Sequence, residues 1–243
     1  MAVLGICNPF FDRSALVTDS FLKQHRLKKD DTTNEIERAP VERTWQGISS
    51  AEKDVWTLGG SGTNVMKTLA RLGHQCRVVG KIGSDERGFD MKERLVKIGI
   101  APMLSRGKAE TGVVNCFITD DKKRTMHTYL GAALELSAGD ISREAFTGAN
   151  HVHLEGYLAF YGETLETSVS FAKGVKATTS FDLASAGVVN MFRPKFQQNV
   201  PKMDVVFGNL EEMAVYTGEQ DFKKAAECFG EKQTIIATDG KAG

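Results

Sequence analysis

Neither sign of charge dominates this sequence, and no apolar run in it is long. The 243 residues contain 31 Lys and Arg and 31 Asp and Glu, so the net charge is near zero. No overall field therefore attracts the chain to nucleic acid or to anionic lipid. No stretch approaches the ~20 apolar residues that a membrane helix needs. These absences leave a small molecule as the expected partner, with no nucleic acid and no membrane.

Cysteines are few, and a secretion signal is lacking. Cys7, Cys76, Cys116 and Cys228 lie far apart without a C-x-x-C pair, which argues against a zinc site or a redox dithiol. A chain of this size also needs no disulfides for stability. The N-terminus is apolar but has no basic flank and reaches a charge at Asp12, so it makes a poor signal peptide. We expect a cytoplasmic protein with reduced thiols.

The sequence does contain 41% hydrophobic residues, arranged as alternating strand-like and helix-like segments. This alternation is typical of a parallel sheet covered by helices. We predict an α/β fold, doubly wound, with a mostly parallel sheet and helices on both faces. The predicted strands are 3–6, 76–80, 151–154, 179–183, 205–207 and 234–237. The predicted helices are 61–72, 89–98, 164–172, 191–198, 210–216 and 222–228.

Two segments interrupt this alternation. Residues 30–53 are polar and show neither a helical nor a strand period, whereas residues 112–129 alternate and turn at Asp120-Asp121, as an antiparallel hairpin would. We interpret both as parts of a small β lid. The whole chain, 1–243, is then one domain, with lid segments at about 13–58 and 101–130 inserted in it.

The segment LGGSGTN joins a predicted strand to a predicted helix. Its Gly59-Gly60 turn lets a ligand approach the backbone, and the free amides of a helix start suit hydroxyl or phosphate oxygens. Asn64 follows Ser61 by one helical turn, so both side chains can face one ligand. No Gly-Lys-Ser/Thr follows, which excludes a Walker loop. The alternative is a tight structural turn with Ser61 as the helix cap.

Polar residues also follow two other predicted strands. Asn8 and Asp12 come after the first strand, and ligands of parallel α/β sheets bind beyond the carboxyl ends of strands. Asp12 could accept hydrogen bonds from sugar hydroxyls there, or it could be a solvated residue of an Asn-Pro turn. Asn209 and Glu212 stand three residues apart where a strand enters a helix. This spacing fits a helix cap, and it also fits a Glu212 that orders a hydrated Mg²⁺.

Two other features favour packing over chemistry. His151 and His153 share one face of a strand, as zinc ligands sometimes do, but no third ligand of suitable spacing appears. Cys228 is interpreted as a buried apolar residue of its helix rather than as a nucleophile.

Taken together, these stretches resemble the ribokinase-like, or PfkB, family of carbohydrate and nucleoside kinases. The resemblance runs through the whole chain in family order. Within the family, FLKQHRL and RTMHTYLGAA look most like adenosine kinases. The matching motifs are NPxxD at Asn8–Asp12, GGSGTN, ITDDKKRTMHTYLGAALEL, HLEGYL, FDLAS, GNLEE, and TxGxxG at 238–243.

The resemblance implies a kinase that uses ATP and Mg²⁺ and phosphorylates a hydroxyl of a nucleoside or sugar. Arg124 matches an arginine that helps to neutralise the transferring phosphate, or it is a solvated charge of the hairpin. The implied substrate-binding residues are Asn8, Asp12, Gly59, Gly60, Ser61 and Asn64. The implied residues of the cofactor site are Asn209, Glu212 (also the Mg²⁺ residue, through water), Thr238, Gly240 and Gly243.

The sequence departs from the family in two respects. Phe10-Phe11 replaces smaller aliphatic residues; with Phe181 these rings could wall a base pocket, or all three could belong to the core. The Gly-Ala-Gly-Asp turn, which holds the family's anion hole and general base, is absent. We therefore expect that the C-terminal part of the fold is missing and that residues 1–243 alone transfer no phosphate.

Three functions stay open at this point. They are a kinase of an adenosine-like nucleoside, a kinase of a ribose- or fructose-type sugar, and a catalytically inactive nucleoside- or sugar-binding protein. The expected state is a monomer, or a homodimer through the β lid.

Overall fold

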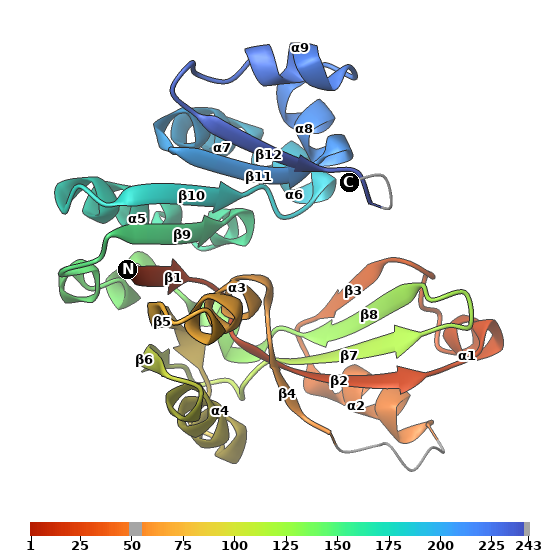
Figure 1. Cartoon of the computed structure of the whole chain (residues 1–243). Coiled ribbons are helices and arrows are strands. Elements are labelled where there is room, and N and C mark those ends of the chain that lie inside the picture. The colour runs from red at the N-terminus through yellow and green to blue at the C-terminus, as the bar shows by residue number, and fades with distance from the viewer. Residues whose placement is uncertain (49–54, 241–243) are drawn as a thin grey trace.

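The computed structural model describes residues 1–48 and 55–240 and contains two separate sheets (Figure 1). The larger sheet has seven strands in the order β12-β11-β10-β9-β1-β5-β6, and every neighbouring pair in it is parallel. The predicted mostly parallel sheet is confirmed. Its strands are β1 (Ala2–Ile6), β5 (Gln75–Ile82), β6 (Ile100–Arg106), β9 (His151–Glu155), β10 (Thr178–Asp182), β11 (Val205–Asn209) and β12 (Thr234–Thr238).

Helices cover both faces of this sheet, as predicted. Residues that alternate along β1 enter two different cores: Val3 joins Met66 and Met91 under α3 and α4, whereas Leu4 joins Phe181 on the opposite face. Inward side chains of a strand alternate between faces, so each face has its own helical layer. The helices are α3 (Ser61–Arg71), α4 (Glu86–Lys97), α5 (Thr164–Gly174), α6 (Ala186–Met191), α7 (Arg193–Asn199), α8 (Leu210–Thr217) and α9 (Phe222–Glu227).

Shorter helical turns complete the connections. The predicted helix 191–198 corresponds to α7, and the separate helix α6 before it was not predicted; Pro194 lies in the first turn of α7. No helix within residues 1–48 and 55–240 has the length and apolar character needed to cross a bilayer. The 3-10 helices are η1 (Gly131–Glu135), η2 (Ala138–Asp140), η3 (Arg143–Phe146), η4 (Gly156–Phe160) and η5 (Val200–Lys202).

The smaller sheet forms the lid and has five strands in the order β3-β8-β7-β2-β4. The hairpin predicted at 112–129 is confirmed, because β7 and β8 pair antiparallel. The predicted segment 101–130 starts too early, since Ile100–Arg106 is an edge strand of the large sheet paired with β5. The lid elements are β2 (Phe10–Leu16), α1 (Asp19–Gln24), β3 (Thr32–Glu35), α2 (Arg38–Gln46), β4 (Thr57–Gly59), β7 (Val113–Ile118) and β8 (Arg124–Tyr129).

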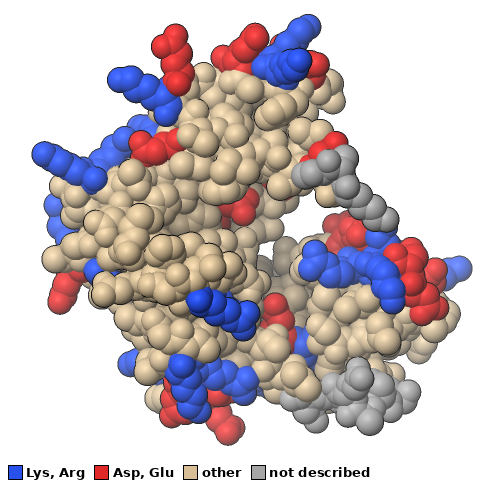
Figure 2. All heavy atoms as spheres, viewed as in Figure 1, with Lys and Arg blue, Asp and Glu red and all other residues tan. Residues whose placement is uncertain are grey.

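The pattern of residues 30–53 did not predict helix α2. It carries buried Val41 and Trp45 and packs on one face of the lid sheet. That face also buries Arg13, which lies in register with Asn115. The opposite face of β2 includes Asp12. A hollow lies between the lid and the rest of the molecule (Figure 2).

Helix α3 approaches β1 very closely. A Cβ added to Gly5 of β1 would lie 2.8 Å from the Cγ atom of Met66, whose side chain is fully buried. Only a glycine allows this separation, because any larger residue would push the helix off the sheet. The start of α3 is thereby fixed beside the carboxyl end of β1.

Met66→Ala should lower the free energy of unfolding by about 2–4 kcal/mol, because it removes buried contacts and leaves a cavity over Gly5. Chemical denaturation followed by circular dichroism measures this loss. Met191→Ala is the matched control: Met191 is 65% exposed at the end of α6, and we expect a change within about 0.5 kcal/mol. Equal losses in both variants would contradict this account of the core.

Candidate active site

Polar residues line the carboxyl edge of the large sheet. Asn209 ends β11, Asp182 ends β10 and Glu155 ends β9, while Asn8 follows the end of β1. These strands are neighbours in the sheet, and Asp182 pairs directly with Glu155. The parallel order therefore assembles one row of polar groups from four distant parts of the sequence.

The predicted substrate residues Asn8, Asp12, Gly59 and Gly60 meet where β2 pairs with β4. A Cβ on Gly59 would lie 2.0 Å from the Asp12 carboxyl carbon, and one on Gly60 would lie 2.1 Å from the backbone oxygen of Asn8. Gly60 also has φ of 91°, a conformation that favours glycine. Both glycines are required by the close approach of the two segments.

Ser61 and Asn64 belong to the first turn of α3. The helix cap is Gly60, without a side-chain bond, so the alternative that Ser61 caps the helix is wrong. The Ser61 hydroxyl instead interacts with the Asp182 carboxylate. The Asn64 side-chain oxygen accepts a hydrogen bond of 2.9 Å from Lys67 Nζ. Ser61 thus connects α3 with the end of β10, whereas the contact of Asn64 stays within α3.

Asp12 and Asn8 each retain a side-chain oxygen ready to accept a hydrogen bond. Oδ1 of each is buried and lacks a partner among the described residues. Burial raises the pKa of Asp12 to about 6, and the positive charge of Lys67 opposes this shift. An unpaired buried acceptor is costly. A ligand that donates hydrogen bonds here would remove that cost.

Glu155 belongs to the same site, although sequence reasoning did not select it. Its side chain is 1% exposed, and burial raises its pKa to about 7. Oε1 accepts the amide of Asn8 and Oε2 accepts the amide of Gly62, both at 2.9 Å. An acidic residue at the end of the apolar strand in HLEGYL was the signal that could have identified it.

At the other end of the row, Asn209 and Glu212 form a capping box at the start of α8. Glu212 Oε2 accepts the backbone amide of Asn209 at 2.9 Å, and Asn209 Oδ1 accepts the amide of Glu212 at 2.8 Å. The helix-cap interpretation is therefore confirmed. Asn209 lies in register with Thr238 of β12, so a residue of the predicted ATP loop stands beside this cap.

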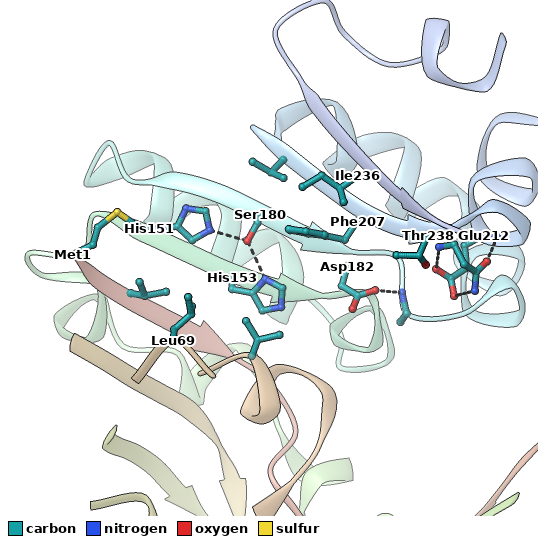
Figure 3. A pocket seen from close by; sticks show the side chains of 16 residues that line it. Met1, Leu69, His151, His153, Ser180, Asp182, Phe207, Glu212, Ile236 and Thr238 are labelled. Atoms are coloured by element: carbon teal, nitrogen blue, oxygen red, sulfur yellow. Dashed lines mark hydrogen bonds between the residues drawn. The ribbon is translucent and has the colours of Figure 1, made fainter. Parts of the chain in front are cut away.

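Asp182, Asn209, Glu212 and Thr238 line an open cavity of about 580 Å³ (Figure 3), whereas the predicted substrate residues and Glu155 are not part of its lining. Asp182, Glu212 and Thr238 form its polar end, and apolar side chains such as Phe207 and Ile236 form the sheet face. Gly240 is exposed with φ of 53°, and Gly243 lies outside the described residues. A polar rim over an apolar floor is the usual character of a small-molecule site.

The donor set fits magnesium held through water. Both oxygens of Glu212 accept hydrogen bonds from Asn209, and no group of three or more metal-binding side chains exists in residues 1–48 and 55–240. Burial and the negative charge of Asp182 both raise the pKa of Glu212. A hydrated cation would relieve this repulsion, whereas direct coordination would need more ligands than the described chain offers.

Arg124 lies on the same face of the lid as Asp12, but farther along the sheet. Asp12 is in register with Val114, whereas Arg124 pairs with Ile118, four residues beyond Val114 along β7. Arg124 is exposed. The structure therefore places it on the same face of the lid as Asp12 and leaves it apart from the row of polar groups.

Two of the three aromatic residues considered for a base pocket are buried in the core, and the third is only partly buried. Phe11 and Phe181 are 1% and 0% exposed and belong to hydrophobic cores. Phe10 is partly buried and lies on the same face of β2 as Asp12. Of the three rings, Phe10 alone has a position from which it could contact a ligand.

The remaining candidates are structural. The side chains of His151 and His153 both hydrogen-bond the Ser180 hydroxyl, at 2.7 and 2.9 Å (Figure 3). Cys228 is exposed, so the expectation of a buried thiol is wrong. It follows the last residue of α9, where the helix ends and no longer faces the core.

Comparison with known proteins finds similarity to adenosine and nucleoside kinases. Adenosine kinase 2 of Arabidopsis thaliana is 22% identical over 225 residues, which cover 88% of this chain. A nucleoside kinase of Methanothermobacter thermautotrophicus is 27% identical over 159 residues, 64% of this chain. The crystal structure of adenosine kinase from Sinorhizobium meliloti matches with a TM-score of 0.85 at 25% identity, covering 97% of this chain and 74% of that one.

The matches extend over only part of the relatives. The chain spans 64% of the length of the Arabidopsis protein and 50% of the length of the Methanothermobacter protein. The model of the pfkB family of carbohydrate kinases matches residues 28–243. Because that match covers most of the sequence, this chain belongs to the pfkB carbohydrate kinase family.

Proposed function

We propose that this chain binds a nucleoside of the adenosine type and that the protein phosphorylates one of its hydroxyls with ATP and Mg²⁺. The observation that carries the proposal is the pair of unpaired buried oxygens, Asn8 Oδ1 in the turn after β1 and Asp12 Oδ1 on β2 of the lid. Vicinal hydroxyls of a ribose supply two donors at the spacing of neighbouring side chains. Relatives named adenosine kinase and nucleoside kinase support this choice.

The ATP phosphates would bind at the opposite end of the row. Thr238 is the last residue of β12 and Gly240 follows the strand, both exposed, and backbone amides after a strand can bind phosphate oxygens. Glu212 would hold water of a magnesium ion that neutralises phosphate charge. The nucleoside and the phosphates would then lie along one edge, with Asp182 between them.

The lid supplies the remaining charge in this proposal. Arg124 lies on the lid face that carries Asp12, and it would reach the transferring phosphate only when the lid moves toward the sheet edge. Its guanidinium would then stabilise the charge that develops on the phosphoryl oxygens. The hollow between the lid and the large sheet gives room for this movement (Figure 2).

A ribose- or fructose-type sugar is the second candidate, and one observation favours it. Two of the three candidate aromatic residues, Phe11 and Phe181, lie in the core, which leaves Phe10 as the single ring available to a base. Calorimetric titration with adenosine, inosine, ribose and fructose distinguishes the two. Binding of ribose without binding of adenosine would reject the nucleoside proposal.

Asp12→Asn should weaken adenosine binding at least tenfold at pH 8, because it replaces a charged acceptor by a neutral amide. Calorimetry on the purified chain measures the dissociation constant. Asp120→Asn is the matched control, since Asp120 is exposed in the turn between β7 and β8, and it should leave the affinity unchanged. Equal affinities of Asp12→Asn and the native chain would reject this role of Asp12.

The same substitution should stabilise the protein without ligand. The pKa of Asp12 rises from 3.8 to about 6 on folding, so between these values the folded state binds more protons than the unfolded state. Stability therefore falls as pH rises through this window, and the penalty is complete above pH 6. Asp12→Asn should remove it and raise the free energy of unfolding at pH 8 by about 1–3 kcal/mol.

Denaturation at pH 8 and at pH 4 checks the sign of this effect. The gain from Asp12→Asn should shrink at pH 4, where the native Asp12 is already protonated. A gain of the same size at both pH values, or a loss at pH 8, would show that burial of the Asp12 charge is not the cause.

A further inference from the structure

Glu155 connects the two segments that carry the predicted substrate residues. Its carboxylate accepts the amide of Asn8, in the turn after β1, and the amide of Gly62, in the first turn of α3. These residues are far apart in the sequence, and Glu155 reaches both from the end of β9. Each carboxylate oxygen thus serves a different segment.

The surroundings of Glu155 leave it little freedom. A Cβ on Gly62 would lie 3.1 Å from Glu155 Oε2 and 2.5 Å from the Cβ atom of Cys7. The side chain is 1% exposed, so water cannot replace either bond. A buried amide that loses its acceptor is destabilising, and the two segments therefore depend on this one carboxylate.

Several titratable groups face Glu155 from the packed elements. Asp182 at the end of β10 repels its charge and adds to the effect of burial, which raises the pKa of Glu155 to about 7. Cys7 on the turn after β1, and Tyr157 and Tyr161 in and after η4, have pKa values raised chiefly by burial and also by Glu155. From α3, the group that reaches the carboxylate is the Gly62 amide.

We propose that Glu155 is a positioning residue whose carboxylate holds the Asn8 turn and the start of α3 at the separation that ligand binding needs. The ionised form accepts both amides. The protonated form presents a hydroxyl, which is a donor, toward one of them, and that amide loses its bond. The effect of Glu155 on ligand binding rests on the proposed function above. The prediction that both amides respond to the protonation of this one carboxylate does not rest on it.

Nuclear magnetic resonance of the ¹⁵N-labelled chain tests the joint behaviour directly. Between pH 5.5 and 8.5 the amide resonances of Asn8 and Gly62 should move together, with one midpoint near 7. In Glu155→Gln the common midpoint should disappear. Asp12 also titrates near Asn8, so the measurement is repeated in Asp12→Asn, where the common midpoint should persist.

Calorimetry tests the consequence for ligand binding. At pH 8, Glu155→Gln should weaken adenosine binding at least tenfold, although the side chain retains its size. Glu144→Gln is the matched control, because Glu144 is exposed in η3, and its affinity and amide shifts should equal those of the native chain. Circular dichroism of each variant confirms that the fold is retained.

The outcomes separate the two proposals. Amides that titrate independently in Asp12→Asn, or that still share the midpoint near 7 in Glu155→Gln, would overturn the role of Glu155. If the amides behave as expected but Glu155→Gln binds adenosine as tightly as the native chain, the positioning role is also rejected. If the native chain binds none of the four nucleosides and sugars, the proposed function fails, and the amide titration still decides whether Glu155 joins the two segments.

Discussion

The close packing of α3 against β1 is the constraint on which the candidate site depends. Gly5 admits the buried Met66 side chain, and Gly62 admits Cys7 and Glu155. In the same way, the absence of side chains at Gly59 and Gly60 lets the turn before α3 lie against the Asp12 side chain and the Asn8 backbone. Since an added methyl group would collide at each of these places, the geometry of the site depends directly on the absence of side chains. The glycines of this region are therefore packing residues first, and they expose backbone to a ligand as a result.

The second property of the site is an accumulation of buried carboxylates. Burial raises the pKa of Asp12, Glu155, Asp182 and Glu212, and the charge of Asp182 adds to the shift of both Glu155 and Glu212. Such groups destabilise the ligand-free protein at neutral pH, because water is replaced by a less polar environment. Hydroxyl donors and a hydrated cation are the ligands that would offset this cost. Stability and binding thus make opposite demands on the same side chains.

The lid is attached to the large sheet by charged and aromatic side chains. The buried Arg13 guanidinium lies between the rings of Trp45 and Trp56, at 4.4 and 4.6 Å from their centres. From α4, Arg94 donates to the backbone oxygen of Trp56 at 2.6 Å, and Arg87 stacks on the Trp56 ring at 4.7 Å. These contacts lie on the lid face opposite Asp12. They hold the base of the lid and leave the face that carries Asp12 and Arg124 free of these contacts.

Periodicity and turn residues were enough to predict the parallel sheet, its two helical layers and the β7–β8 hairpin. Periodicity and turn residues are local signals in the sequence, and both signals were strong in these segments. They did not predict α2, whose segment is polar and has only a few buried residues such as Val41 and Trp45. They also assigned β6 to the lid, because an edge strand gives no local sign of the sheet it joins.

For the site, the sequence by itself determined which residues could bind: Asn8, Asp12 and Asn64 were recognised by their place after strands and at a helix start. Only the tertiary structure decided which of them act together. Glu155 shows why: its partners, the amides of Asn8 and Gly62, lie 147 and 93 residues away in the sequence. No local pattern encodes a contact over such a separation, because it is created by the order of strands in the sheet.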